Sequence, residues 1–518
     1  MYQRLLTRRY LTSKVMPLLA ALAVVLCTAM VLISWSVMGG FLKNLMESGR
    51  TLIGDVSINW PNAGFAHYED LIQRLEAHPE IDAASPMIET AGMLALPGDR
   101  LVRVIVRGID GPSYAAVTTY EDTLYWQPLE EPLPKDDARR DWRLENHTRW
   151  QRTFNNGLTL TEPDPATGEP RPAVVIGIET SGYNFRQPAG FIIPGIPLVP
   201  GADGVMGQLP IFLPDEKVTL HVLPIDSSGR GIEMVTRILP VANEFRSGLY
   251  EIDKQTVLVN LRALQSMLNM DEARRVIEDP TEDLSAADPF ALGGDEADPN
   301  FEPIQRVEID PARVTDIVVL GRQDDARLTQ QYVLDVYTEF AAAHPDVPRA
   351  DAIFIKTWED QNATMIAAVK KETALVLFIF SFISLTAVFL VLAIFWAMVS
   401  EKTRDVGILR AIGASRTGIA WLWLRYGLAI GVVGSIFGLA LAYTIVYNIN
   451  TIHDWMGVAL GISIWDPAVY YFTEIPSRVN HLHAAIIGLG GMLASTLGAL
   501  WPALRAARMN PVRALRFE

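Results

Sequence analysis

The sequence predicts a membrane α-helical protein with four transmembrane helices and a large extracytoplasmic domain of mixed α/β type. Four apolar runs without a charged residue lie at residues 15–41, 374–399, 426–446 and 482–501. Each reaches the roughly 20 apolar residues that a helix needs to cross a bilayer, where charged side chains are costly. The first two runs enclose one hydrophilic block, residues 42–371, which is long enough to build its own core.

Basic residues predict the orientation. Segment 1–14 carries four basic residues and no acid, and segments 400–425 and 502–518 also have more Lys and Arg than Asp and Glu. Basic loops stay in the cytoplasm. We therefore expect a cytoplasmic segment (1–14), a membrane helix (15–41), an extracytoplasmic domain with stalk helices (42–371), a membrane helix (372–399), a cytoplasmic loop (400–425), a membrane helix (426–446), an extracytoplasmic loop (447–481), a membrane helix (482–501) and a cytoplasmic tail (502–518).

The first apolar run is expected to anchor the chain. It is much longer than the roughly 7–15 residues of a signal-peptide core. The single cysteine of the chain, Cys27, lies inside this run, where we expect it to face lipid or pack against a helix. With one cysteine no intramolecular disulfide can form, so the exported domain must be held by its own core.

Alternating and buried apolar patterns predict the elements of the large domain. Strands are expected at 102–108, 173–178, 217–223, 232–239, 256–260 and 316–320, and helices at 67–78, 261–268 and 328–344. Asp110-Gly111-Pro112 is predicted to be a turn. Two acidic, proline-containing stretches, 127–172 and 271–311, are predicted to be surface insertions or mobile loops. Helices are also expected to continue past the bilayer at 43–48 and 358–371, either as a rigid stalk or as ordinary juxtamembrane helices.

Glycines recur on one face of each of the last two membrane helices. Their spacing of three and four residues lets a neighbouring helix approach closely. Either generic helix packing or a sharper role, a dimer seam or a sliding gate, explains them. The predicted helix-packing residues are Gly427, Gly431, Gly434 and Gly438 in the third run and Gly488, Gly491 and Gly498 in the fourth.

Catalytic motifs are absent from the sequence. There is no P-loop, no HExxH, no CxxC and no Gly-x-Ser-x-Gly. His481 and His483 lie beside the last membrane helix, but a metal site needs three or four ligands and no further ones are identified. We therefore expect no catalytic residue, no metal, no cofactor bound by this chain and no nucleic-acid partner. If the protein does work, the energy must come from a partner.

Segment 401–415 is where such a partner is expected to bind. It reads Glu-Lys-Thr-Arg-Asp-Val-Gly-Ile-Leu-Arg-Ala-Ile-Gly-Ala-Ser, which predicts a short amphipathic helix ending at glycine. Ile408, Leu409 and Ile412 would form an apolar patch flanked by Asp405 and Arg410. The segment is either a solvated basic loop or a helix whose exposed apolar residues fit a groove of another protein.

The same segment resembles the coupling-helix signature of the FtsX-like ABC transporter permeases. The tail, with Pro-Ala-Leu-Arg-Ala-Ala at 502–507 and Asn-Pro-Val-Arg-Ala-Leu-Arg-Phe-Glu at 510–518, resembles the ending of that family. Ser-Val-Met-Gly-Gly-Phe at 36–41 is similar to the segment that closes the first span in the lipoprotein-releasing LolC/LolE branch, with Gly39 in place of Asn. Arg-Gly-Ile-Asp at 107–110 and Val-Ile-Gly at 175–177 look like strand ends of that branch.

The resemblance implies a four-span permease of the mechanotransmission type with a MacB/LolC-like external domain, in the bacterial inner membrane. It implies as partners a dimeric cytoplasmic ABC ATPase, which would hold ATP and Mg²⁺, a second permease subunit, identical or homologous, and a lipoprotein or other periplasmic protein. The ATPase-coupling residues that it implies are Glu401, Lys402, Asp405, Gly407, Ile408, Leu409, Arg410, Ile412 and Gly413.

Three functions remain open. Lipoprotein release is favoured, a MacB-like exporter subunit is the second, and an FtsX-like transmitter that regulates an external cell-wall hydrolase is the third. MacB-type chains usually carry a fused ATPase, and FtsX external domains are smaller than this block. The LolC branch captures its chaperone with a proline-bearing hairpin loop, whereas the matching place here, 226–231, is short and has no proline.

Overall fold

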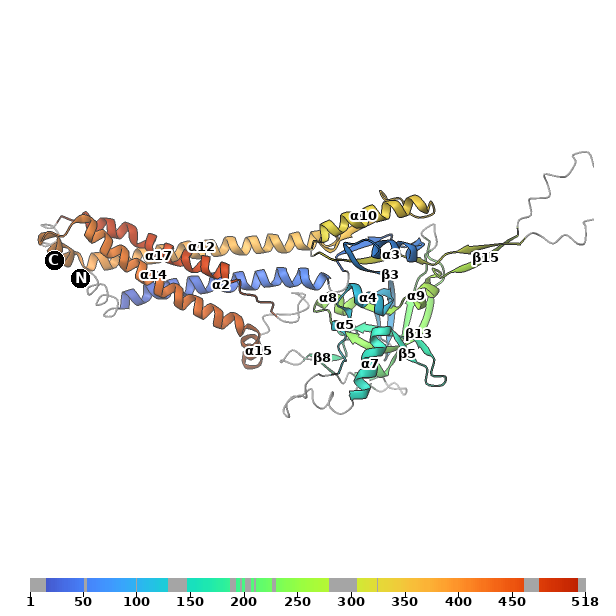
Figure 1. The fold of residues 1–518 in the computed structure, drawn as a ribbon. Coiled ribbons are helices and arrows are strands. Elements are labelled where there is room, and N and C mark those ends of the chain that lie inside the picture. The colour runs from blue at the N-terminus through green and yellow to red at the C-terminus, as the bar shows by residue number, and fades with distance from the viewer. Residues whose placement is uncertain are drawn as a thin grey trace, which may run out of the picture. The chain divides into compact units, whose positions relative to one another are not determined.

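The computed structural model describes residues 15–50, 54–98, 100–128, 147–186, 192–195, 198–200, 206–208, 211–225, 230–278, 305–323, 325–460 and 475–510. The chain divides into two compact units. Residues 1–46 and 363–518 make a helical unit, and residues 47–362 make an α/β unit (Figure 1). Each unit has a hydrophobic core of its own.

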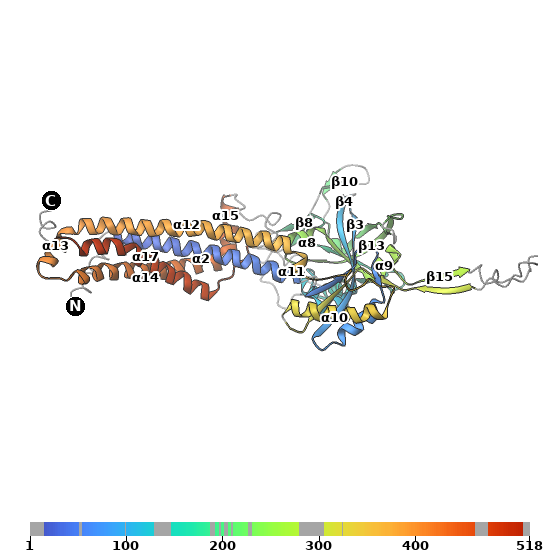
Figure 2. The same ribbon diagram turned by 90° about the horizontal axis from the view of Figure 1, so that it is seen from above.

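The helical unit contains four helices that are long and apolar enough to cross a membrane. These are α2 (Val15–Arg50), α12 (Ala363–Glu401), α14 (Arg416–Tyr447) and α17 (His481–Ala507), with the shorter α13 (Thr403–Ala411) and α15 (Ile449–Leu460). The long helices run beside one another (Figure 2). Phe395, Ile430 and Ala499 are fully buried between them. Four membrane-length helices confirm the predicted helical fold class.

The helices extend past the apolar runs that predicted them. Helix α14 begins at Arg416, capped by the Ser415 hydroxyl, which accepts from the Gly418 amide at 3.0 Å. Residues 416–425 of the predicted cytoplasmic loop are therefore helical. The predicted continuous helix 358–371 is interrupted at Asn362, between α11 (Trp358–Gln361) and α12. Apolarity marks the part of a helix that lipid surrounds, whereas capping groups decide where the helix ends.

The α/β unit is built on one nine-stranded sheet of order β12-β13-β7-β14-β4-β3-β18-β1-β19. Strand β12 pairs with β13 and also with the end of β3, so six strands close into a ring. The strands are β1 (Val56–Asn59), β3 (Ile81–Leu96), β4 (Arg100–Ile109), β7 (Val174–Gly177), β12 (Lys217–Val222), β13 (Val235–Phe245), β14 (Thr256–Asn260), β18 (Asp316–Gly321) and β19 (Phe354–Thr357).

Helices and short two-stranded sheets surround this sheet. The helices are α3 (Tyr68–Glu76), α4 (Gly111–Val117), α5 (Tyr120–Thr123), α7 (His147–Thr159), α8 (Tyr250–Gln255), α9 (Leu261–Leu268), α10 (Ala326–Ala343) and the 3₁₀ turn η1 (Leu213–Asp215). The short pairs are β2 (Phe65–Ala66) with β17 (Arg313–Val314), β5 (Thr161–Pro163) with β6 (Pro170–Pro172), β8 (Asn184–Arg186) with β9 (Ile192–Pro194), β10 (Leu198–Pro200) with β11 (Met206–Gln208), and β15 (Ala273–Glu278) with β16 (Gln305–Asp310).

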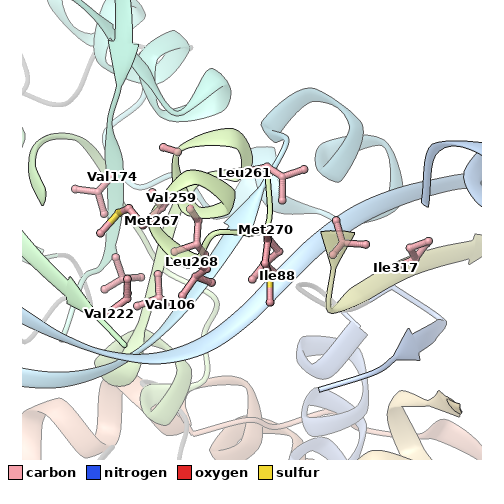
Figure 3. Close-up of a cluster of buried hydrophobic side chains, with 14 of the residues drawn as sticks. Ile88, Val106, Val174, Val222, Val259, Leu261, Met267, Leu268, Met270 and Ile317 are labelled. Carbon is pink, nitrogen blue, oxygen red and sulfur yellow. The ribbon is translucent and has the colours of Figure 1, made fainter. Parts of the chain in front are cut away.

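The core of the α/β unit lies where α9 packs on the sheet. Leu268 of α9 lies near Val106 of β4 and Val259 of β14 in one buried cluster (Figure 3), to which Leu264 of α9 also belongs. The α9 helix starts where Asn260 accepts a hydrogen bond from the Ala263 amide, and it ends at Asn269 in the left-handed region. Six predicted strands and three predicted helices have counterparts here, so the mixed α/β class is confirmed.

One local prediction is wrong, and the mobile-loop alternative fails for the described parts of two others. Asp110-Gly111-Pro112 is not a strand turn but the start of α4, because the Asp110 carboxylate accepts from the Ser113 amide. Residues 147–172 form α7 and the β5–β6 hairpin instead of a loop, and Trp150 is buried. The ends of segment 271–311 pair as β15 and β16. Residues 129–146 and 279–304 of these two stretches lie outside the described part of the chain.

Candidate coupling site and the packing of the helical unit

Helix α13 is a short, tightly bounded helix between α12 and α14. Its end is a Schellman turn, in which Gly413 has φ of +103° and the Ala414 amide donates to the Leu409 carbonyl at 3.0 Å. Arg410 donates from Nη1 to the Ala414 carbonyl at 2.9 Å. A residue with a Cβ would be strained at Gly413, so the sequence Ile-Gly-Ala-Ser sets both the end of α13 and the cap of α14.

One face of α13 is buried. Val406 is 3% exposed and packs with Met398 and Trp423 of the neighbouring helices, and Gly407 beside it is buried as well. Lys402 and Asp405 pair at 3.0 Å in the first turn. This face holds α13 against the helical unit, so the helix is not a freely solvated loop.

The opposite face of α13 is exposed and partly apolar. Ile408 is 42% exposed and Ile412 is 81% exposed, one helical turn apart. Arg404, a further turn back, is also exposed, as is Glu401 at the end of α12. Leu409, predicted to share the patch, is half-buried. We call Arg404, Ile408 and Ile412 the α13 stripe.

The four predicted glycines of α14 are buried against helices of the same chain. A Cβ on Gly427 would lie 2.6 Å from the Ala499 Cβ, and one on Gly431 would lie 3.0 Å from Met492 Cα, both in α17. Gly434 and Gly438 instead face α2, where added Cβ atoms would lie 2.7 Å from Val24 and 2.8 Å from the Val25 carbonyl oxygen.

The predicted glycines of α17 are also close to other helices. Added Cβ atoms would lie 3.0 Å from Leu439 at Gly488, 2.6 Å from the Ser435 hydroxyl at Gly491 and 3.0 Å from Val391 at Gly498. Each spacing is at or below the closest approach that real Cβ atoms make. Within one chain, therefore, these faces serve helix–helix packing.

The Ser-Val-Met-Gly-Gly-Phe segment also makes a close approach. A Cβ on Gly40 would lie 2.8 Å from the Pro476 carbonyl oxygen, and the Arg478 amide donates to the Ser36 carbonyl at 3.2 Å. Gly39 has no neighbour within 4 Å of an added Cβ. The chain before α17 thus packs on α2 at Gly40, and the Gly39 position is tolerant.

His481 and His483 each hydrogen-bond to an aromatic residue. The Tyr443 hydroxyl lies 2.8 Å from His481 Nδ1, and the Trp35 indole donates to His483 Nδ1 at 3.1 Å. Both rings also contact those aromatic rings.

An apolar cavity of about 390 Å³ lies between α2, α12 and α17. Its lining includes Val24, Val388 and Gly491, with Cys27 donating to the Ser384 hydroxyl across it at 3.6 Å. Cys27 therefore lines a space between helices. A cavity of this size and polarity suits hydrocarbon rather than a charged solute.

The α/β unit holds a polar cavity of about 470 Å³ at β1, β3, β4 and β18. Arg107 Nε donates to the Glu89 carboxylate at 2.8 Å, and Asn59 donates to Asp316 at 2.7 Å. Burial raises the pKa of Asp316 to about 6, helped by the nearby Glu89 charge and opposed by its hydrogen bond from Thr315. The Arg-Gly-Ile-Asp segment noted in the sequence supplies Arg107 of this cavity.

The comparisons with known proteins place the C-terminal part of the chain in a family. Residues 377–511 match the family model described as FtsX-like permease C-terminal. This part of the chain is therefore an FtsX-like permease domain, with α13 and its stripe inside it. The family suspected from the sequence is confirmed.

The lipoprotein-releasing proteins are among its relatives. The chain is 27% identical over 164 residues to the lipoprotein-releasing system transmembrane protein LolC of Xylella fastidiosa (strain 9a5c), covering 32% of this chain and 40% of that protein. It is 27% identical over 117 residues to the LolE protein of Haemophilus influenzae, covering 23% and 28%. The matches therefore span less than half the length of these relatives.

A solved structure of the periplasmic region of MacB from Actinobacillus actinomycetemcomitans also matches. The identity is 10% and the TM-score 0.27, with 62% of this chain and 97% of that chain covered.

Proposed function

We propose that this chain is the permease subunit of an ABC transporter, in which a separate ATPase drives work on lipoproteins at the outer side of the inner membrane. The observation that carries the proposal is the α13 stripe. It lies in the FtsX-like permease domain, on a helix whose other face is fixed to the helical unit. Because α13 is packed against the membrane helices, a movement that a bound partner imposes on α13 would be passed on to those helices.

The chemistry of the α13 stripe indicates what kind of surface would bind it. Ile408 and Ile412 give one apolar strip a turn apart, and Arg404 gives it a positive end. A groove on a soluble protein, apolar with an acidic rim, would receive this face. The family resemblance supports a dimeric cytoplasmic ATPase as that protein, which would hold ATP and Mg²⁺, and a second permease subunit, identical or homologous.

The orientation follows from charge. The basic segments 1–14, 400–425 and 502–518 would lie in the cytoplasm, and the α/β unit outside. This puts the α13 stripe on the ATPase side. The apolar cavity between α2, α12 and α17 supports a lipid-embedded cargo. An acyl chain can move from lipid into an apolar space at a small free-energy cost, whereas its exposure to water is unfavourable.

The test is purification of the tagged protein from its own membranes in gentle detergent, with mass spectrometry of the co-purifying proteins. We expect a stoichiometric ABC ATPase together with acylated lipoproteins. The ATPase with a cell-wall hydrolase and no lipoprotein would replace lipoprotein release by the transmitter function. The absence of any ATPase would contradict the coupling role of α13.

A matched pair of variants separates coupling from folding. Ile408→Asp puts a charge in the α13 stripe and should abolish partner-stimulated ATP hydrolysis while membrane insertion is unchanged. Ile238→Asp, at a residue of β13 that is 66% exposed, is the control. Equal hydrolysis in the two variants would remove α13 from the mechanism.

A further inference from the structure

Two histidines and two aspartates from distant parts of the chain meet on the α/β unit. His67 precedes α3 and Asp70 lies in its first turn, whereas His344 ends α10 and Asp346 follows it. His67 Nε2 lies 2.9 Å from Asp346 Oδ2, and His344 Nε2 lies 3.0 Å from Asp70 Oδ2. The two imidazole rings stack with centroids 4.4 Å apart.

The backbone holds both histidines in place. His67 has φ of +58°, in the left-handed region that few side chains adopt, and it forms the N-terminal boundary of α3. His344 precedes Pro345, which keeps it extended, and its amide donates to the Phe340 carbonyl at 3.1 Å. The centroid of the buried Phe340 ring lies 4.9 Å from that of the His344 ring. The backbone of each histidine is therefore fixed by its own element.

From this geometry we propose that His67, His344 and Asp346 bind a zinc ion. One potential ligand atom from each lies within 4.8 Å of the others. The ligand atoms of a tetrahedral zinc site are about 3.3 Å apart, because each bond is about 2 Å long. Because the two rings stack, at least one must rotate about its side-chain bonds before both can point at one ion. The side chains are between a quarter and about half exposed, so there is room for this rotation and for water to complete the shell.

Charge and chemistry favour this ion. Two carboxylates and one guanidinium, that of Arg74 at 2.9 Å from Asp70, surround two imidazoles, so a divalent cation would meet net negative charge. Imidazole nitrogen with carboxylate oxygen is a ligand set that zinc accepts. Asp70 would keep its hydrogen bond to His344 Nε2, which leaves Nδ1 of that ring for the ion. Carboxylates hold ligating histidines in this way.

The ion would join the start of α3 to the end of α10, which are far apart in sequence. Bound zinc would then hold these two helices together on the extracytoplasmic domain. This inference does not depend on the transport function proposed above. Nor does it involve His481 and His483, which belong to the helical unit.

The experiment uses the full-length protein in detergent, carrying an affinity tag without histidine, and stripped with a chelator. Zinc is added at pH 7.5, and bound metal is counted by mass spectrometry after dialysis. Cobalt is the second probe, because its visible spectrum reports the ligand geometry. We expect one zinc per chain and a higher unfolding temperature with zinc than without it.

Three variants and a control decide the result. His67→Asn keeps the left-handed backbone that asparagine tolerates. His67→Asn and His344→Ala should each abolish zinc binding. Asp70→Asn should weaken zinc binding by about 10- to 100-fold. His221→Ala, at a β12 residue that bonds Thr236, should bind as the unmodified protein does. No bound zinc in the unmodified protein, or equal binding by His67→Asn, would overturn the proposal and leave two histidine–aspartate hydrogen bonds.

Discussion

Truncation of Ile412 tests the α13 stripe quantitatively. Full burial of an isoleucine side chain is worth about 1.5–3 kcal/mol. Ile412 is 81% exposed in the isolated chain, so most of this free energy is still available for binding a partner. Ile412→Ala should therefore weaken binding of the proposed ATPase partner by about 2 kcal/mol, which is about 30-fold in Kd.

A second position sets the scale. Ile408 is 42% exposed, so half of its burial is already realised within the chain. Ile408→Ala should weaken ATPase binding by about 1 kcal/mol, or about fivefold. The predicted order of the two effects, Ile412 before Ile408, comes from the structure alone, because the sequence gives both residues the same chemistry.

The assay is binding of the purified ATPase to the full-length protein in nanodiscs, by biolayer interferometry. The thermal unfolding of each variant is measured in parallel and should be unchanged for Ile412→Ala. Ile238→Ala, in the α/β unit, is the control and should bind as the unmodified protein does. Full-strength binding by Ile412→Ala would refute the assignment of the stripe as the ATPase contact.

Two further predictions concern packing and pH. Gly427→Val should destabilise the helical unit by about 1–3 kcal/mol through overpacking against α17. Gly490→Val should not, because a Cβ at that position would have open space around it. Thermal unfolding in detergent distinguishes the two variants. Burial raises the pKa of Glu244 from 4.5 to about 7, against hydrogen bonds from Trp126 and Asn184. Its contribution to stability is present below pH about 4.5 and is lost as pH rises through about 7, by about 3 kcal/mol. Glu244→Gln should flatten this part of the unfolding-temperature profile, and an unchanged slope would contradict the raised pKa.

Local patterns in the sequence were enough for the membrane helices and for several strands. An apolar run long enough to cross a bilayer is visible in any window of the chain, as is the Ile-Gly-Ala-Ser end of α13. In contrast, β3 was not predicted, although it is the longest strand of the sheet. Its sequence contains Pro86 and Gly92 and lacks a steady alternation. Pairing with β18, β4 and β12 makes it a strand.

The candidate sites divide in the same way. The sequence located the α13 segment but included Leu409 in its apolar patch, because periodicity does not say how far a helix is rotated against its neighbours. Packing of Val406 and Gly407 on the helical unit set that rotation and left Ile408 and Ile412 outside. The glycine faces were likewise visible as a pattern, and only the folded chain decided which helix each glycine meets.

The sequence by itself determined the class of protein, because bilayer thickness and the cost of buried charge act on consecutive residues. It also carried the family motifs, which are contiguous. Tertiary structure alone decided the closure of the strand ring and the meeting of His67 with His344. These depend on contacts between residues far apart in the chain, and the free energy of such contacts is set by the packing of whole elements rather than by any local pattern.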